Sequence, residues 1–562
     1  MDFPGDLYFF LINLLSSWKV LYIIAAIVSL FTLALVYLPW IKTEKPPGRA
    51  SIKIFSSPLL FLLLITIFII LMRMPTFLLD EQNIDESLWI AGTATFLHSP
   101  QLWTSFDTTT SGPLVMLPLV LIKLTGLDLN YASARLAGIL FCIIPGVIFC
   151  YYTFRILLDE KLSRILILPL TACFAFMNSG DYTAYNGEHE IILFSSIAIF
   201  LHTKLLMGNK QSKYFLLYGL TLGALPFTKL QATPITLALG FCLLVFLIKS
   251  KTNLSSYALI FLSIMSPFVL ILMWLLITDG TQDFWFAYII SNLKYGQPGI
   301  GINGSSWLYF KYFVYLLRTL PDSKFYFISL ISVSALSGIT VSFRKKIMGK
   351  HLFLLLSSIA LLFSAYYAIV KTSFFYQHYF LIFLIPVLFF TAIIAWISRD
   401  TFSRSKLFNS ALIILPLICF VMVAIDGITR INNPSSINHS SLKKSLVAQT
   451  INKYGKGNDG MAIWGWMPGL YVQTGLINGT RYGDCYHQFT KSRMQQYYLD
   501  KYLEDLKKNK PLIFADAITS YSYGPNAAEF KYQNFPNIRD YVEAHYRKAE
   551  VAEEIEIFIR KD

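Results

Sequence analysis

Residues 80–113 read DEQNIDESLWIAGTATFLHSPQLWTSFDTTTSGP and form the first long polar stretch of an otherwise apolar N-terminal half. The stretch contains five carboxylates: Asp80, Glu81, Asp85, Glu86 and Asp107. The two apolar runs before it, residues 18–40 and 58–74, contain no acid, and their only charges are Lys19 and Arg73. Acidic side chains are therefore concentrated in one loop, and we expect the rest of the chain to act as its scaffold.

The composition identifies the class of protein. Hydrophobic residues make up 55% of the chain and charged residues 14%, whereas about 25% of the residues of a soluble domain are charged. Apolar runs of about 20 residues predict membrane spans. We expect about twelve transmembrane helices, at 18–40, 57–75, 131–157, 165–180, 189–207, 214–229, 231–249, 255–277, 324–341, 351–370, 377–398 and 407–428. The predicted fold class is a polytopic α-helical membrane protein.

Basic residues in the short connections predict the orientation. With the N-terminus outside, every predicted inner connection is basic, including residues 161–164, 249–251 and 344–350, as the positive-inside rule requires. The acidic stretch then lies on the outer side. The net charge of +14 fits contact with anionic membrane lipids and does not point to a nucleic-acid partner.

From about residue 430 the chain becomes polar and contains no further span. Apolar segments at 461–464, 511–515 and 554–559 alternate with helix-like segments such as 492–508, which predicts a small α/β unit. The predicted domains are a membrane domain, 1–428, with its outer loop at 76–130, and a soluble domain, 429–562. Five of the six cysteines fall inside predicted spans, so the sequence predicts no disulfide framework.

Asp85 and Glu86 begin a segment whose apolar positions, Leu88, Trp89, Thr95 and Phe96, fit one face of a short helix along the membrane surface. Such a helix would hold a carboxylate at the lipid–water boundary. The same acids would also suit an ordinary helix N-terminus. Further on, Gly112-Pro113 signals a turn, and the run at 114–124 predicts a second interfacial helix that returns Asp107 to the membrane.

A second polar group occurs at 178–190, NSGDYTAYNGEHE, where a predicted span begins on the same outer side. It contains Asp181, Glu188 and His189. Carboxylates at membrane depth are costly unless they are paired, and they favour a functional interpretation. First-turn acids that interact with the helix dipole are the alternative.

Three further sites lie at the outer ends of spans. Lys229 occurs in LPFTKLQATP (225–234), a Pro-flanked break between two half-length spans, where a cavity is tolerated and a cation needs an anionic partner. Arg135 lies where the next span after the acidic stretch begins, and His378-Tyr379 lie at another span start. Snorkelling towards the interface is the simpler interpretation of Lys229 and Arg135.

The order of these motifs resembles the GT-C superfamily of membrane glycosyltransferases, whose members include protein O-mannosyltransferases and lipid A aminoarabinose transferases. The matching features are Asp85-Glu86 with Trp89, the Ala-Arg at Arg135, the Asn-x-Glu-His opening of the helix at Glu188, the Thr-Lys break at Lys229, and His378-Tyr379. The run at 464–471 (WGWMPGLY) with Arg481-Tyr482 also resembles the outer domains of such enzymes, for acceptor docking or for packing.

The resemblance implies transfer of a sugar from a polyprenyl-phosphate carrier to a glycan, lipid or protein acceptor at the outer face of a bacterial inner membrane. Asp85 and Glu86 are the predicted catalytic residues, with Asp85 as general base. Substrate-binding residues would be Asp107, Arg135, Asp181, Glu188, His189, Lys229, His378 and Tyr379, with Lys229 and Arg135 on the leaving phosphate. Asp85 and Glu188 are candidate ligands for a divalent ion, Mg, Mn or Ca. A transporter or lipid flippase is the alternative function.

Overall fold

The computed structural model describes residues 57–294 apart from 78 and 109, residues 305–342, 348–402, 406–431 and 444–561, and three isolated positions near the N-terminus. Within these ranges, eight helical segments are long and apolar enough to cross a membrane. They are Pro58–Phe77 (α4), Tyr131–Leu157 (α7, Tyr131–Gly138; η3, Ile139–Ile143; α8, Ile144–Leu157), Glu188–Leu206 (α11), Leu230–Lys249 (η5, Leu230–Ala232; α13, Thr233–Lys249), Leu254–Ile277 (α14), Lys350–Val370 (α19), Gln377–Ser398 (η7 and most of α20) and Ser410–Thr429 (within α21, Lys406–Ile431). The chain is therefore a multi-pass membrane protein.

Eight of the twelve predicted spans are thus confirmed as span-length helices. The predicted span at 18–40 lies outside the described residues. The other three are helices that fall short of this length and apolarity: α9 (Glu160–Phe176), α12 (Ser212–Ala224) and α18 (Lys324–Ser342), whose apolar part is Lys324–Ile339. α12 is short because the chain leaves the α-helix at Leu225–Phe227, where Pro226 stands, before α13 begins.

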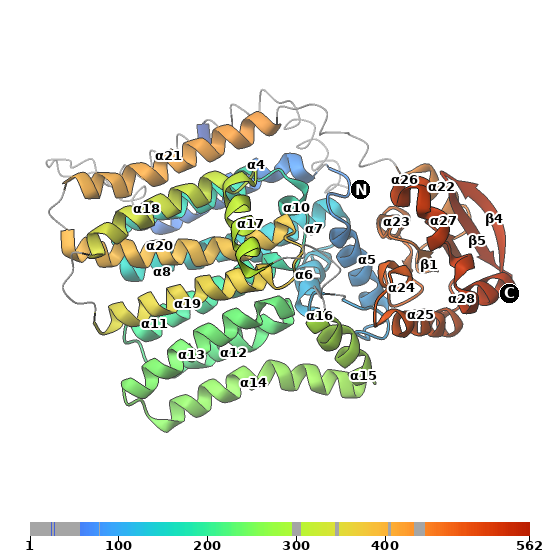
Figure 1. Cartoon of the computed structure of the whole chain (residues 1–562), viewed down its shortest axis with the longest axis horizontal. Helices are drawn as coiled ribbons and strands as arrows, with labels where there is room; N and C mark the ends of the chain where they lie inside the picture. The colour runs from blue at the N-terminus through green and yellow to red at the C-terminus, as the bar shows by residue number, and fades with distance from the viewer. Residues whose placement is uncertain are drawn as a thin grey trace.

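The long helices lie side by side in Figure 1 and form the larger part of the molecule. α20 (Leu381–Phe402) lies at the centre, since 94% of the apolar window of this span is buried inside the protein, against 11% for α14. A helix that is apolar on all sides is expected in such an interior position. α14 instead presents its apolar side chains at the periphery, where lipid would cover them.

The acidic stretch folds between these helices and the C-terminal residues (Figure 1). It forms α5 (Ile84–His98) and then η2 (Pro113–Met116) with α6 (Leu117–Leu124), so both predicted short helices are present. The prediction of a single buried face on α5 is wrong, and its position along a membrane surface stays a prediction. Residues 86–93 of α5 are all buried, because α23 (Gly469–Thr474) and β2 (Ile477–Asn478) pack against it.

Residues 444–561 form the C-terminal unit, which contains all the described named strands. Its five-stranded sheet has the order β2-β1-β3-β5-β4, in which β1 runs parallel to β2 and β3, and β5 runs antiparallel to β3 and β4. The predicted strands are confirmed as β1 (Gly460–Trp464), β3 (Ile513–Asp516) and β5 (Ile555–Arg560), and the predicted helix as α25 (Gln495–Asn509). β4 (Tyr546–Ala552) was not predicted. Four of its seven residues are exposed, and its polar and apolar residues do not alternate as they do in a strand with one buried face.

The shorter elements connect these parts. They are α10 (Gly180–Thr183), η4 (Leu225–Phe227), α15 (Thr281–Asp283), η6 (Phe284–Ile290), α16 (Ser291–Lys294), α17 (Ser306–Thr319), η7 (Gln377–Phe380), α22 (Leu446–Ile451), α24 (Tyr486–Phe489), α26 (Ser520–Tyr523), η10 (Gly524–Asn526), α27 (Ala527–Phe530), η11 (Tyr532–Asn534) and α28 (Pro536–His545).

Candidate active site

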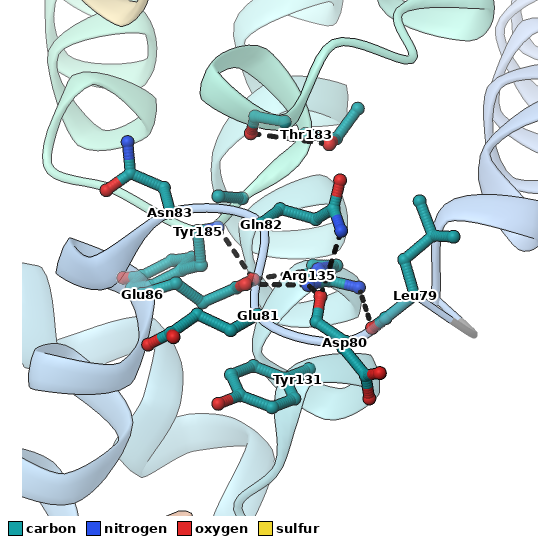
Figure 2. A network of polar contacts seen from close by, with 12 residues as sticks. Leu79, Asp80, Glu81, Gln82, Asn83, Glu86, Tyr131, Arg135, Thr183 and Tyr185 are labelled. Carbon is teal, nitrogen blue, oxygen red and sulfur yellow. Dashed lines mark hydrogen bonds and ion pairs between the residues drawn. The ribbon is translucent and has the colours of Figure 1, made fainter. Parts of the chain in front are cut away.

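Arg135, on α7, holds the start of the acidic stretch in place (Figure 2). Its Nε and one Nη2 proton donate to the two carboxylate oxygens of Glu86, at 2.8 and 2.7 Å. Its Nη1 donates to the carbonyls of Thr76 and Leu79, both at 2.6 Å, and Nη2 also donates to the carbonyl of Asp80 at 2.7 Å. A guanidinium has five N–H donors, so all of them are in use inside the protein.

All of the Arg135 donors are used within the protein, and the predicted contact of Arg135 with the leaving phosphate stays a prediction. The same pairing holds Glu86 inside the protein. The Glu86 side chain is completely buried, and its Oε1 also accepts a hydrogen bond from the backbone N–H of Tyr185 at 3.0 Å. Glu86 therefore ties α5 to α7 and to the chain that follows α10, and its neighbour Asp85 is the acid left to face a cavity.

Asn83 joins Asp85 to a second carboxylate. Its side-chain oxygen accepts from the backbone N–H of Asp85 at 2.9 Å and so caps α5. Its side-chain nitrogen donates to Oδ1 of Asp181 at 2.8 Å. Oδ2 of Asp181 lies 3.7 Å from Nδ1 of His378. Asp85, Asp181 and His378 thus lie together although they are far apart in the sequence. Asn83, which links the first two, was not predicted, although an Asn before a helix start is a recognised capping signal.

These residues line a cavity of about 620 Å³ that residues of the C-terminal unit also line. Its lining includes the predicted residues Asp85, Asp181, His378 and Tyr379. It also includes residues outside the predicted catalytic and substrate-binding set, among them Gln82, Asn83, Thr110, Lys294, Tyr376, Asp484, Tyr486, His487, Tyr498 and Trp466, the last from the run considered for acceptor docking. The predicted residues Glu86, Asp107, Arg135, Glu188, His189 and Lys229 are not part of this lining.

The two acids nearest α5 differ in their proton affinity. Burial raises the pKa of Asp85, and the negative charges of Glu188 and Asp181 raise it further against the opposing effects of His378 and Lys229. Burial would also raise the pKa of Asp181, but the nearby charge of His378 and a hydrogen bond from Asn83 outweigh it and lower the pKa below its usual range. Asp85 is therefore the better proton acceptor, and Asp181 remains ionised.

Lys229 lies behind this wall at the break between α12 and α13. Its Nζ is 2.6 Å from Oε1 of Glu188, with both side chains buried, and 4.7 Å from the centre of the Tyr379 ring. The acidic stretch reaches the same point, because Ser111 forms an antiparallel bridge with Lys229 and the N–H of Gly112 donates to the carbonyl of Thr228 at 2.8 Å. Lys229 thus has an internal carboxylate as its anionic partner.

Gly112 permits this close approach. A Cβ atom at position 112 would lie 1.9 Å from the carbonyl oxygen of Phe227, so only glycine fits there.

Two further predicted residues are buried near the site without lining the cavity. Asp107 donates its backbone N–H to the carbonyl of Arg481 at 2.8 Å, and His189 accepts from the backbone N–H of Asn186 at 3.4 Å.

The C-terminal unit supplies the opposite side of the site. Gly483 packs on α5, where a Cβ would lie 2.6 Å from the Leu88 side chain, and this contact places the next residue, Asp484, in the cavity wall. Burial raises the pKa of Asp484 to about 6, and the charge of Asp85 adds to this effect against a hydrogen bond from the N–H of Tyr486. The sequence around Asp484, a single acid between Gly483 and Cys485, does not indicate a functional role for it.

Arg481 fixes the C-terminal unit to the rest of the protein. Its guanidinium pairs with Asp505 at 2.8 Å inside the unit and with Asp283 of α15 at 2.9 Å outside it. It also donates to the carbonyl of Trp103 in the acidic stretch at 3.3 Å. Of the two roles considered for the segment with Arg481, packing is the one that these contacts support for this residue.

Glu81 lies at the same junction and is a half-buried acid. Its carboxylate accepts a hydrogen bond from Ser87 and would lie 3.3 Å from a Cβ at Gly469 of α23. Burial raises the pKa of Glu81 to about 7, with the hydrogen bond from Ser87 opposing that shift. The folded protein therefore binds this proton more tightly than the unfolded chain does.

We expect the thermal stability to fall as pH rises from about 5 to 8. The unfolded chain releases the Glu81 proton near its ordinary pKa, whereas the folded protein holds it up to a higher pH, so rising pH favours the unfolded chain. The loss is on the order of 3 kcal/mol across that window. Glu81→Gln should remove this part of the pH dependence and leave Tm higher than the wild type at pH 8. Glu529→Gln, at an exposed acid, is the control. Parallel Tm–pH curves for wild type and Glu81→Gln would refute the assignment.

A divalent ion at Asp85 and Glu188 has little support from the side chains. No group of three His, Cys, Asp or Glu residues that could hold a metal ion occurs in the described parts of the chain. The Glu188 carboxylate is paired with the Lys229 ammonium, and a second cation beside that ammonium would be repelled.

Comparison with known proteins gives a match of fold. No family model and no curated protein matches the chain. ArnT from Cupriavidus metallidurans bound to undecaprenyl phosphate superimposes with a TM-score of 0.56 at 12% identity, covering 89% of this chain and 98% of that chain, and apo ArnT does so with a TM-score of 0.52. The oligosaccharyltransferase AglB from Archaeoglobus fulgidus gives 0.45 at 10% identity, covering 87% and 72%. The chain therefore has the fold of ArnT.

Proposed function

We propose that this protein is an inverting glycosyltransferase that moves a sugar from a polyprenyl-phosphate carrier to an acceptor substrate. The observation that carries the proposal is the cavity of about 620 Å³ in which Asp85, Asp181 and His378 meet, on a fold shared with ArnT. One ArnT structure contains undecaprenyl phosphate, which supports a carrier lipid of that class here.

Asp85 acts as the general base in this proposal. Its carboxylate lines the cavity, and its raised pKa brings its proton affinity closer to neutral pH, where a general base is most effective. It would take the proton of the acceptor hydroxyl as that oxygen attacks the anomeric carbon, and the bond from that carbon to the carrier phosphate would break. Asp181, which stays ionised, would orient a hydroxyl group of one substrate.

Lys229 stabilises the leaving phosphate. Its ammonium lies against the ring of Tyr379. Tyr379 lines the cavity and follows His378, another lining residue, in the sequence. A phosphate that enters here competes with Glu188 for the ammonium and gains a charge-assisted hydrogen bond. Glu86 and Arg135 act as positioning residues, since together they set the direction of α5.

The proposed location is a bacterial inner membrane with the cavity outside. The basic inner connections support this orientation, and the C-terminal unit would then face the periplasm. The corresponding division of the chain is a membrane domain at 1–428 and an outward domain at 429–562.

The proposal is tested with purified protein, a radiolabelled sugar on undecaprenyl phosphate, and candidate acceptor fractions. The expected result is a labelled product with one sugar added to the acceptor, detected by mass, and free undecaprenyl phosphate in equal amount. Passage of the labelled carrier between the two leaflets of a vesicle with no new glycosidic bond would instead assign the protein as a flippase.

A paired substitution tests the role of Lys229. Lys229→Met alone would leave Glu188 as an unpaired buried charge, which costs about 3–5 kcal/mol. We therefore combine it with Glu188→Gln and expect the apparent KM for the carrier-linked donor to rise about 10-fold, the value of one charge-assisted hydrogen bond. Glu188→Gln alone keeps the ammonium and should keep donor affinity. An unchanged donor KM in the double variant would remove Lys229 from the phosphate site.

A further inference from the structure

We propose that the part of the cavity wall formed by Trp466, Asp484 and Tyr486 is a carbohydrate subsite that holds the acceptor substrate. The inference rests on the proposed function and adds the chemical class of the acceptor to it. All three residues belong to the C-terminal unit and line the cavity into which Asp85 projects.

Aromatic rings line the cavity from two different parts of the chain. Trp466 and Tyr486 form one pair, with ring centres 5.2 Å apart, and Trp466 is 43% exposed although it is a large apolar side chain. Tyr376 and His378 stack nearly parallel, 5.6 Å apart at 9°, and Tyr376 is 41% exposed. Aromatic side chains in a cavity wall suit the apolar C–H faces of a flat ring-shaped ligand.

Asp484 adds a hydrogen-bond acceptor beside the first ring pair. Its side chain is 8% exposed, and its Oδ1 accepts from the N–H of Tyr486 at 2.9 Å. No described residue donates to its Oδ2. A carboxylate kept at such low exposure is costly unless donors reach it, and sugar hydroxyls that enter the cavity would supply them.

The chemistry of the lining favours a sugar over a lipid tail or a peptide. The aliphatic side chains in the lining are limited to Ile84, Leu88 and Met494, which is too few to enclose an acyl chain. No residue of a described strand lines the cavity, so a peptide finds no sheet edge to extend. Aromatic faces alternating with carboxylates and amides match a molecule that presents C–H faces and hydroxyl groups.

The subsite is held rigidly before any ligand binds. The backbone N–H of Trp466 donates to the hydroxyl of Tyr523 at 2.7 Å, and the Gly483–Leu88 contact fixes Asp484 relative to α5. Ordering costs on binding are therefore small. The subsite also shares one cavity with Asp85, so a sugar bound there can present a hydroxyl to the proposed base.

The test uses the full-length protein in detergent on two printed arrays, one of oligosaccharides that contain hexoses, hexosamines, deoxyhexoses and uronic acids, and one of peptides. The wild type should retain a subset of the oligosaccharides. Trp466→Ala and Asp484→Asn should each weaken that binding about 10-fold or more, the effect of removing a central contact residue. Trp466→Phe, which keeps an aromatic face, should stay within about threefold of wild type.

Tyr521→Ala is the matched control, because Tyr521 is an aromatic residue of the same unit, 97% exposed and outside the cavity lining. It should bind oligosaccharides as the wild type does. Equal binding by Trp466→Ala, Asp484→Asn and wild type, or retention of peptides in place of oligosaccharides, would overturn the inference.

Binding of undecaprenyl phosphate, measured on the same preparations by native mass spectrometry, separates the two proposals. Wild type that binds the carrier lipid but no oligosaccharide contradicts the acceptor inference alone. Wild type that binds oligosaccharides but not the carrier lipid contradicts the proposed function and leaves the carbohydrate subsite standing.

Discussion

Asp85→Asn is expected to reduce sugar transfer by about 100- to 10,000-fold, the usual contribution of a positioned general base. The amide keeps the size of the side chain but cannot take up the acceptor proton. The cap of α5 should survive, because Asn83 binds the backbone N–H of residue 85 and not its side chain. Initial rates at saturating donor and acceptor measure the effect, and native mass spectrometry should show undecaprenyl phosphate bound as in the wild type.

Asp128→Asn provides the matched control, since Asp128 is an acid of the same outer region whose side chain is 88% exposed and pairs with Lys123. Its rate should equal that of the wild type.

The wild-type rate should fall as the pH is lowered. The fall should begin at a higher pH than it would with an ordinary aspartate as base, because the pKa of Asp85 is raised. Near-normal turnover of Asp85→Asn would transfer the role of base to another lining acid, Asp181 or Asp484.

Arg135→Met is expected to prevent folding. The substitution leaves the fully buried Glu86 without its cation, which costs about 3–5 kcal/mol. It also removes the Arg135 donor from the carbonyls of Thr76 and Leu79, at about 1–3 kcal/mol for each. Together these losses match the whole stability of many domains, about 5–15 kcal/mol.

Fluorescence-detected size-exclusion chromatography measures the outcome as the amount of monodisperse protein. Arg135→Lys should not restore it, because an ammonium lacks the planar fork and two of the five donors. Arg155→Met is the control: Arg155 pairs with Glu160 at 2.7 Å with both side chains partly exposed, and such pairs contribute about 1 kcal/mol or less. Folded Arg135→Met that has lost donor affinity would return Arg135 to the phosphate site.

Local patterns in the sequence predicted the membrane helices well. A run of about 20 apolar residues has one stable solution in lipid, a helix, so length and composition located eight spans that the structure confirms. Three of the five strands were equally visible as short apolar runs. β2 has two residues, which is too short a stretch for any periodicity to appear.

The candidate site was predictable only in part. The acids of 80–113 and 178–190 stood out because charge is rare in this chain, and Asp85 and Asp181 do line one cavity. Pairing was not visible, however, because an ion pair such as Arg135 with Glu86 joins residues 49 positions apart and depends on how the helices pack. Asp484 could not be found for the same reason, since its place depends on the Gly483–Leu88 contact between distant segments.

Arg481 also has a consequence for how the protein is made. Synthesis proceeds from the N-terminus, and Arg481 follows its contact Trp103 by 378 residues. A nascent chain therefore exposes its acidic stretch and its membrane helices long before the C-terminal wall of the cavity exists. Asp283 is also synthesised before Arg481, with which it forms an ion pair in the folded protein. The cavity is completed as one of the last events of biogenesis, so a partly synthesised chain has no enclosed site in which to act.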